Sequence, residues 1–139
     1  MNKNLIIITF FLCQLYFCQT EKKDCPNEVS YFAYSLDDWY VPIKYEIIGD
    51  FIDLKIRKKD KDELFIRFKI IKTLSCDFID VSNCKLKYKV LTYDEETNSY
   101  EQRISEIEFN FSDGKGKIYI QHPNFPLITS DATSIDKAQ

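Results

Sequence analysis

Apolar and polar residues alternate with a period of two along most of the chain from Trp39 onward. This spacing is typical of β-strands that place one face on a core and the other in solvent. The apolar positions are mostly β-branched or aromatic, which are the residue types that suit a pleated sheet. Six runs show the alternation: Ile43/Tyr45/Ile47, Ile52/Leu54/Ile56, Leu64/Ile66/Phe68/Ile70, Leu86/Tyr88/Val90, Ile107/Phe109/Phe111 and Ile118/Ile120.

Polar or glycine-containing stretches separate these runs, and a further strand is predicted over Val29–Leu36. No segment of useful length has apolar residues at helical spacing. We therefore predict an all-β fold, an antiparallel β-sandwich of about seven strands that is compatible with an immunoglobulin-like topology. A small β-barrel is the alternative. The sandwich is favoured because the chain holds only three glycines, and barrel strands need small residues where they bend.

Opposite charges predict the register of one hairpin, in which Lys85–Val90 pairs with Arg103–Phe111. A slip of one residue would place lysines against apolar side chains and invert both faces. Each opposite-charge pair across two strands contributes about 0.2–1 kcal/mol to stability. The expected register sets Lys85 opposite Glu108, Leu86 opposite Ile107 and Lys87 opposite Glu106.

The N-terminal segment has the organisation of an export signal. Lys3 precedes an apolar region that begins at Leu5, and this region is shorter than the roughly 20 residues that span a bilayer. We predict a cleaved signal peptide over residues 1–19 and an extracytoplasmic location, periplasmic or secreted. An uncleaved anchor helix is the alternative. A lipid on Cys18, left by cleavage before that residue, is a further alternative and is the only membrane link expected of the mature protein.

The remaining chain is predicted to form one β domain over residues 20–122, since 139 residues are too few for two domains of ordinary size. Residues 123–139 are predicted to be a partly disordered C-terminal extension. The formal net charge of the whole chain is −3, and removal of residues 1–19 leaves 18 basic and 22 acidic side chains, or −4. This balance argues against a nucleic-acid partner.

Three cysteines remain after cleavage: Cys25, Cys76 and Cys84. In an oxidising compartment cysteine pairs are first interpreted as disulfides. We expect Cys76 to pair with Cys84 across a short loop, with a bond from Cys25 to Cys76 or Cys84 as the alternative. The sequence has no CxxC motif and only one histidine, so no metal site is predicted.

Two surfaces are candidates for binding. The first is an aromatic and acidic segment, Tyr34, Asp37, Asp38, Trp39 and Tyr40, which can also be interpreted as core. The second is a basic stripe on the strands, which includes Lys55, Arg57, Arg67, Lys69, Lys85, Lys87 and Lys89. Such a stripe would suit an acidic partner. Alternatively, it is a solvated face whose cations pair with Asp53, Glu106 and Glu108.

Catalysis is not expected. His122 is the single imidazole of the chain, and no GxSxG or comparable frame accompanies it. No cofactor is predicted. The sequence is interpreted as an exported, non-catalytic binding domain of the cell envelope or extracellular space with a protein partner. The alternatives are an inhibitor or immunity protein that presents Lys58–Glu63 or the aromatic segment, and a small-ligand-binding β-barrel. The oligomeric state is not predicted.

Overall fold

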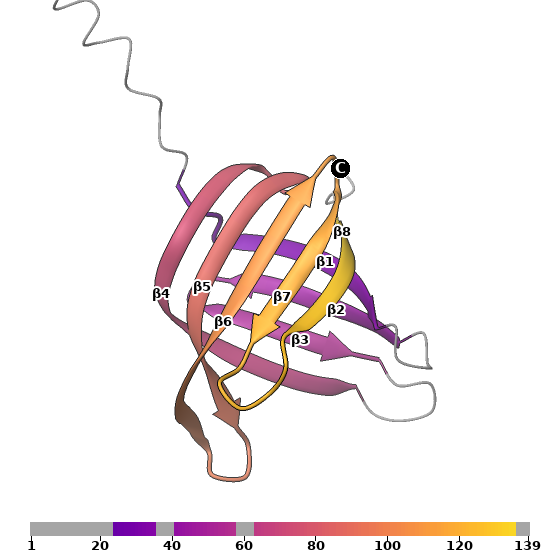
Figure 1. The fold of residues 1–139 in the computed structure, drawn as a ribbon. Coiled ribbons are helices and arrows are strands. Elements are labelled where there is room, and N and C mark those ends of the chain that lie inside the picture. The colour runs from indigo at the N-terminus through magenta and orange to yellow at the C-terminus, as the bar shows by residue number, and fades with distance from the viewer. Residues whose placement is uncertain (1–23, 36–40, 58–62, 136–139) are drawn as a thin grey trace, which may run out of the picture.

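The protein is an all-β closed barrel of eight antiparallel strands in the computed structural model, which describes residues 24–35, 41–57 and 63–135 (Figure 1). Each strand pairs with the next along the chain, and the last strand pairs with the first. The strands are β1 (Glu28–Ser35), β2 (Val41–Ile48), β3 (Phe51–Ile56), β4 (Leu64–Asp80), β5 (Asn83–Asp94), β6 (Ser99–Ser112), β7 (Lys115–Gln121) and β8 (Ile128–Ser134).

The all-β prediction and its barrel alternative are confirmed, whereas the preferred seven-stranded sandwich is wrong. β1 has partners on both edges, because Phe32 lies opposite Lys44 of β2 and opposite Thr133 of β8. β8 lies within residues 123–139, which the sequence analysis assigned to a C-terminal extension, so the barrel continues to Ser134. The long strands bend through register shifts, three between β4 and β5 and one between β5 and β6, where we had expected glycine.

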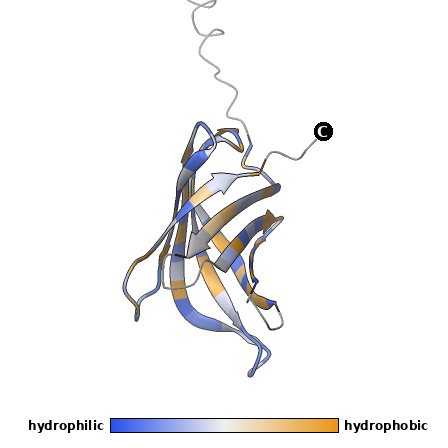
Figure 2. Cartoon of the chain, turned by 90° about the vertical axis from the view of Figure 1, so that its right-hand side faces the viewer, coloured by the Kyte–Doolittle hydropathy of each residue, from blue (hydrophilic) through white to orange (hydrophobic). Residues whose placement is uncertain are grey.

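The period-two alternation separates the interior from the outer surface. Figure 2 shows hydrophilic and hydrophobic residues alternating along the strands. Phe109 is fully buried, and its ring centroid lies 5.2 Å from that of Tyr31, 6.1 Å from that of Tyr45 and 6.5 Å from that of Tyr88. An eight-stranded barrel has an interior just wide enough for side chains to fill. In this barrel, aromatic rings and branched aliphatic side chains fill it.

Small residues line the seam at which the sheet closes. The registers place Phe111 opposite Gly116, Gly116 opposite Ala132, and Ala132 opposite Ala33. A Cβ atom on Gly116 would lie 2.0 Å from the carbonyl oxygen of Asn110, so no larger residue fits without displacing backbone. The Tyr31 ring stacks on the Phe111 ring, with centroids 4.2 Å apart. Small side chains on β7 and β8 therefore leave room for large aromatic ones on β1 and β6.

The register of β5 with β6 differs by two residues from the one expected. Lys87 lies opposite Glu108, not Glu106, and Leu86 lies opposite Phe109. Near the turn, Tyr93 lies opposite Tyr100. The next pair is Leu91 with Ile104, so β6 advances four residues where β5 advances two, and the register shifts by two. An even shift keeps every side chain on its face.

The expected ion pairs form all the same, as diagonal contacts between the two strands. The Lys87 Nζ–Glu106 Oε2 distance is 2.8 Å, and the Lys85 Nζ–Glu108 Oε1 distance is 3.9 Å. The charge pattern therefore identified the correct partners, although it placed them directly opposite one another.

A disulfide joins Cys25, which precedes β1, to Cys76 of β4, with the two Cα atoms 5.8 Å apart. The favoured Cys76–Cys84 bond is therefore wrong, and Cys84 is a buried free thiol. Cys84 lies opposite Phe78, whereas Cys76 lies opposite Leu86, so the two cysteines are offset by two positions on paired strands. The bond ties the segment before β1 to β4, the first strand of the β4–β5 hairpin.

Removal of the Cys25–Cys76 bond is expected to destabilise the protein. It closes a loop with a sequence separation of 51, for which chain-entropy arguments give about 4 kcal/mol. Cys25→Ser and Cys76→Ser should lower the free energy of unfolding in urea equally, and a reductant should not lower it further in either variant. An unchanged urea midpoint after reduction of the wild type would contradict this role.

The buried phenols predict a loss of stability at high pH. Burial raises the pKa of Tyr88 to about 12 and that of Tyr45 to about 12, although a hydrogen bond with Ser130 partly opposes the second shift. The native state retains these protons above pH 10 while the unfolded chain loses them, so stability is full below about pH 10 and falls toward pH 12. The expected slope is about 1.4 kcal/mol per pH unit for each tyrosine. Urea midpoints measured from pH 8 to 12 test this, and Tyr88→Phe should flatten the slope.

Candidate functional site

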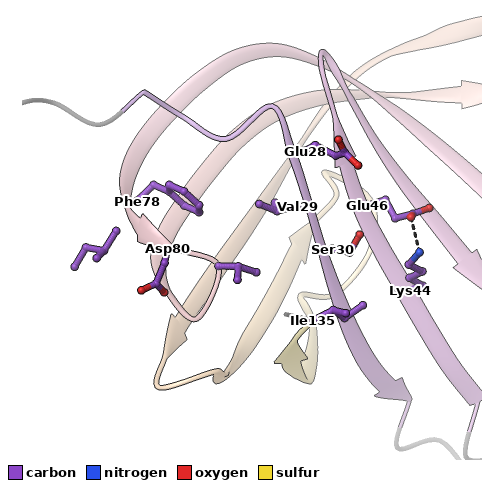
Figure 3. A pocket seen from close by; sticks show the side chains of 10 residues that line it. Glu28, Val29, Ser30, Lys44, Glu46, Phe78, Asp80 and Ile135 are labelled. Carbon is purple, nitrogen blue, oxygen red and sulfur yellow. Dashed lines mark hydrogen bonds and ion pairs between the residues drawn. The ribbon is translucent and has the colours of Figure 1, made fainter. Parts of the chain in front are cut away.

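An open groove of about 590 Å³ lies where the β4–β5 turn passes the beginning of β1 (Figure 3). β1 and the β4–β5 turn form its two walls, and side chains from the outer face of β2 extend it. Its lining is Glu28, Val29, Ser30, Lys44, Glu46, Phe78, Ile79, Asp80, Val81 and Ile135. Pockets of this volume are typical of small-molecule sites and of clefts that accept a few side chains.

Local hydrogen bonds fix the wall that the turn provides. Asp80 Oδ1 accepts from the backbone N–H of Ser82 at 2.9 Å and from that of Asn83 at 2.8 Å. Ser82 in turn joins the neighbouring elements, because its carbonyl accepts from Gly114 N–H at 3.0 Å and its hydroxyl lies 3.0 Å from that of Ser134. The turn is therefore tied to Gly114 of the β6–β7 turn and to Ser134 of β8, and Ser134 pairs with Tyr31 of β1.

The floor of the groove is apolar and continuous with the barrel core. Val29 belongs to the core and is 7% exposed, and the partly buried Phe78 and Val81 pack against that core. Ile79 stands at the rim with 68% of its surface exposed. Burial of a partner's apolar side chain here would release water from surfaces that the protein itself leaves uncovered.

The groove is lined by more carboxylates than amines. Glu46 lies between two lysines, with Oε1 2.5 Å from Lys44 Nζ and Oε2 2.7 Å from Lys55 Nζ. Burial would raise the pKa of Glu46, but the hydrogen bonds and charges of the two lysines outweigh it and lower that pKa. Figure 3 shows the other two carboxylates, Glu28 and Asp80, on opposite walls. The lining carries three carboxylates and one amine, so the groove is acidic overall.

Three polar side chains lie behind the floor. The Tyr31 hydroxyl is 3.1 Å from Cys84 Sγ, and the Tyr88 hydroxyl is buried with no hydrogen-bond partner among the described residues. Burial raises the pKa of Cys84 more than the Tyr31 hydrogen bond lowers it, which keeps the sulfur in its thiol form. The thiol form is a poor nucleophile, so this cysteine contributes to packing rather than to chemistry at the groove.

Four of the seven cations in the predicted basic stripe form ion pairs, and one of these is Lys55 with Glu46 at 2.7 Å. Arg67 pairs with Asp53 at 2.8 Å, and Lys87 and Lys85 pair with Glu106 and Glu108. Lys89 lies opposite Glu106 on one side and Lys72 on the other. None of the three predicted lysines of β5 lines the groove.

The predicted aromatic segment is not tested. Asp37, Asp38, Trp39 and Tyr40 lie outside the described residues, and of Tyr34 only the backbone is described, paired with Pro42 and Asp131. The loop Lys58–Glu63 is described at Glu63 alone, and the predicted signal peptide with Cys18 lies outside the described ranges. His122 lies 3.6 Å from Glu101, away from the groove.

Sequence reasoning missed the groove because its walls come from distant parts of the chain. Phe78–Val81 was interpreted as part of a loop between two bonded cysteines, and only barrel closure brings it beside β1. The structure contains, in its described ranges, no helix long and apolar enough to cross a membrane and no group of three or more His, Cys, Asp or Glu that could hold a metal. Comparisons with protein-family models, curated proteins and solved structures give no significant match.

Removal of the hydroxyl group should affect the stability of the protein differently at Tyr31 and at Tyr88. Tyr88→Phe removes a buried hydroxyl that has no described partner, so the free energy of unfolding should be unchanged or higher. Tyr31→Phe removes the contact with Cys84 and should lower that free energy by about 1 kcal/mol. Urea denaturation of both variants tests the pair, and a larger loss for Tyr88→Phe would contradict the arrangement.

Proposed function

We propose that this protein is an exported, non-catalytic binding domain that holds a basic and apolar segment of a protein partner in the β1/β4–β5 groove. The single observation that supports this most is the groove itself, whose apolar floor lies between two carboxylate-bearing walls. A lysine or arginine side chain suits it, because its methylene stem covers apolar surface while its charge stays at the rim. The Cys25–Cys76 disulfide is compatible with an oxidising compartment.

The side chains that the described strands pack into the interior argue for binding on the outside of the barrel. Tyr31, Tyr45 and Phe109 occupy the centre, together with aliphatic side chains from every strand but β8, which contributes Ala132. The small-ligand alternative would require a cavity among these residues. The inhibitor alternative is based on the loop Lys58–Glu63 or the aromatic segment, both of which lie largely outside the described residues, so the groove gives it no support.

The proposal predicts selective binding of basic, apolar peptides. Titration of the ¹⁵N-labelled protein with an alternating Lys/Leu hexapeptide should shift the amide signals of Val29, Ser30 and Phe78–Val81, whereas a Glu/Leu hexapeptide should not. Ile79→Asp combined with Ile135→Asp should weaken binding at least tenfold, because charge replaces apolar contact. Ile128→Asp, on an exposed residue that does not line the groove, is the matched control. Equal affinity for both peptides, or shifts away from the groove, would refute the proposal.

A further inference from the structure

A second surface with the composition of an interface lies on the outer face of β3, β4, β5 and β6. The registers place four residues in one row across these strands, with Phe51 opposite Lys69, Lys69 opposite Leu91, and Leu91 opposite Ile104. Their chain neighbours Ile52, Phe68, Val90 and Ser105 are all buried inside the barrel. Because successive side chains of a strand alternate between faces, the row faces outward. We name as the β3–β6 patch the residues Phe51, Phe65, Arg67, Lys69, Leu91, Tyr93, Tyr100 and Ile104.

Arg67 is held rigidly at the centre of this patch. Its Nε and Nη2 atoms each donate to one carboxylate oxygen of Asp53 at 2.8 Å, which is a two-point contact. Its guanidinium carbon lies 5.0 Å from the Phe51 ring centroid and 5.3 Å from that of Phe65. Asp53 is almost fully buried beneath it, whereas 40% of the Arg67 side chain is exposed. The side chain is thus fixed before any partner arrives, and it remains partly accessible to one.

Aromatic surface continues onto the β5–β6 hairpin. The Lys69 ammonium lies 5.7 Å from the Tyr100 ring centroid, and the Tyr100 and Tyr93 rings meet edge to face at 5.2 Å. Ile104 is 45% exposed and Phe65 is 37% exposed. Tyrosine, phenylalanine and arginine are enriched at protein interfaces, and arginine and tyrosine often contribute most of the binding energy.

The rest of the outer face has a different character. Several cations there form ion pairs with carboxylates, as in Lys87–Glu106, Lys117–Asp131 and Lys44–Glu46. In the patch, the one carboxylate beneath Arg67 is already used, and Lys69 makes no ion pair with a described residue. The next cation along β4 after Lys69 is Lys72, and it lies opposite Lys89. The patch is therefore apolar and aromatic, with Arg67 and Lys69 as its cations, and the carboxylates Asp94, Glu95 and Glu96 lie beyond Tyr93 at the hairpin end.

We propose that the β3–β6 patch docks an acidic protein surface, in which apolar side chains cover Phe65 and Ile104 while carboxylates approach Arg67 and Lys69. Charge complementarity identifies this occupant, because a carboxylate can accept the guanidinium donors that Asp53 leaves unused. The patch shares no residue with the groove and selects the opposite charge. It therefore stands as a site of its own, whatever the outcome at the groove.

Titration with an acidic, aromatic probe tests the patch. An alternating Glu/Trp hexapeptide should shift the signals of Phe65, Arg67, Lys69 and Tyr100, and the affinity should fall steeply between 20 and 200 mM NaCl. Lys69→Ala with Ile104→Ser should weaken binding at least tenfold, and both substitutions lie at exposed positions that leave the Arg67–Asp53 pair intact. Lys117→Ala, in the neutralised part of the outer face, should have no effect.

Three results would overturn the proposal. Unchanged affinity in the double variant, or an equal loss in Lys117→Ala, would show non-specific attraction and overturn the proposal. Sedimentation velocity of the protein alone supplies the other decisive result. Concentration-dependent dimerisation that Ile104→Ser abolishes would identify a second copy as the occupant and overturn the acidic partner, whereas a monomer at all concentrations supports it.

Discussion

The pairing of β1 with β8 is the interaction on which the rest of the structure depends. This pairing joins the two edges of the sheet and so closes the barrel. Tyr31 and Ala33 are completely buried in the closed barrel. The seam is possible because Ala33, Gly116 and Ala132 are small and share one row with Phe111. A larger residue at Gly116 would collide with the backbone of Asn110 and of Phe111, whose ring stacks on Tyr31.

Closure also determines where function can reside. Because the interior is filled by aromatic and aliphatic side chains, recognition is expected on the outer surface. The groove forms because the closed barrel places the beginning of β1 beside the β4–β5 turn (Figure 3). The β3–β6 patch lies elsewhere and carries the opposite charge. The two proposed surfaces differ in the chemistry they select, so a partner for one does not compete chemically for the other.

Much of the fold could be predicted from the alternation of residue types, because a period of two assigns each side chain to a face. Tyr45, Ile52, Leu86, Phe109 and Ile118 are all buried as that pattern requires. Strand β8 was missed, and the barrel was predicted only as the alternative, because the buried side chains of β8 are the small Ser130 and Ala132, which give no apolar signal. The register shifts between β4 and β5 were also missed, because an extra residue in one strand has no distinct pattern in the sequence of either strand.

The candidate sites were less predictable than the fold. Arg67 was part of the basic stripe, but its neighbours Phe51 and Phe65 come together around it only through the β3–β4 register. The same holds for the groove, where Val29 and Phe78 are 49 positions apart in the sequence. Charge patterning did identify the right ion pairs on β5 and β6, because the pairs tolerate a diagonal geometry that a backbone register does not.

The most direct test of this account is a nuclear Overhauser experiment on the contact between β1 and β8. The closed barrel predicts cross-strand signals between Ala33 and Ala132 and between Phe32 and Thr133, together with slow amide exchange on both strands. Absence of these signals, with β1 and β8 exchanging as open edges, would show a sheet that does not close and would contradict the account.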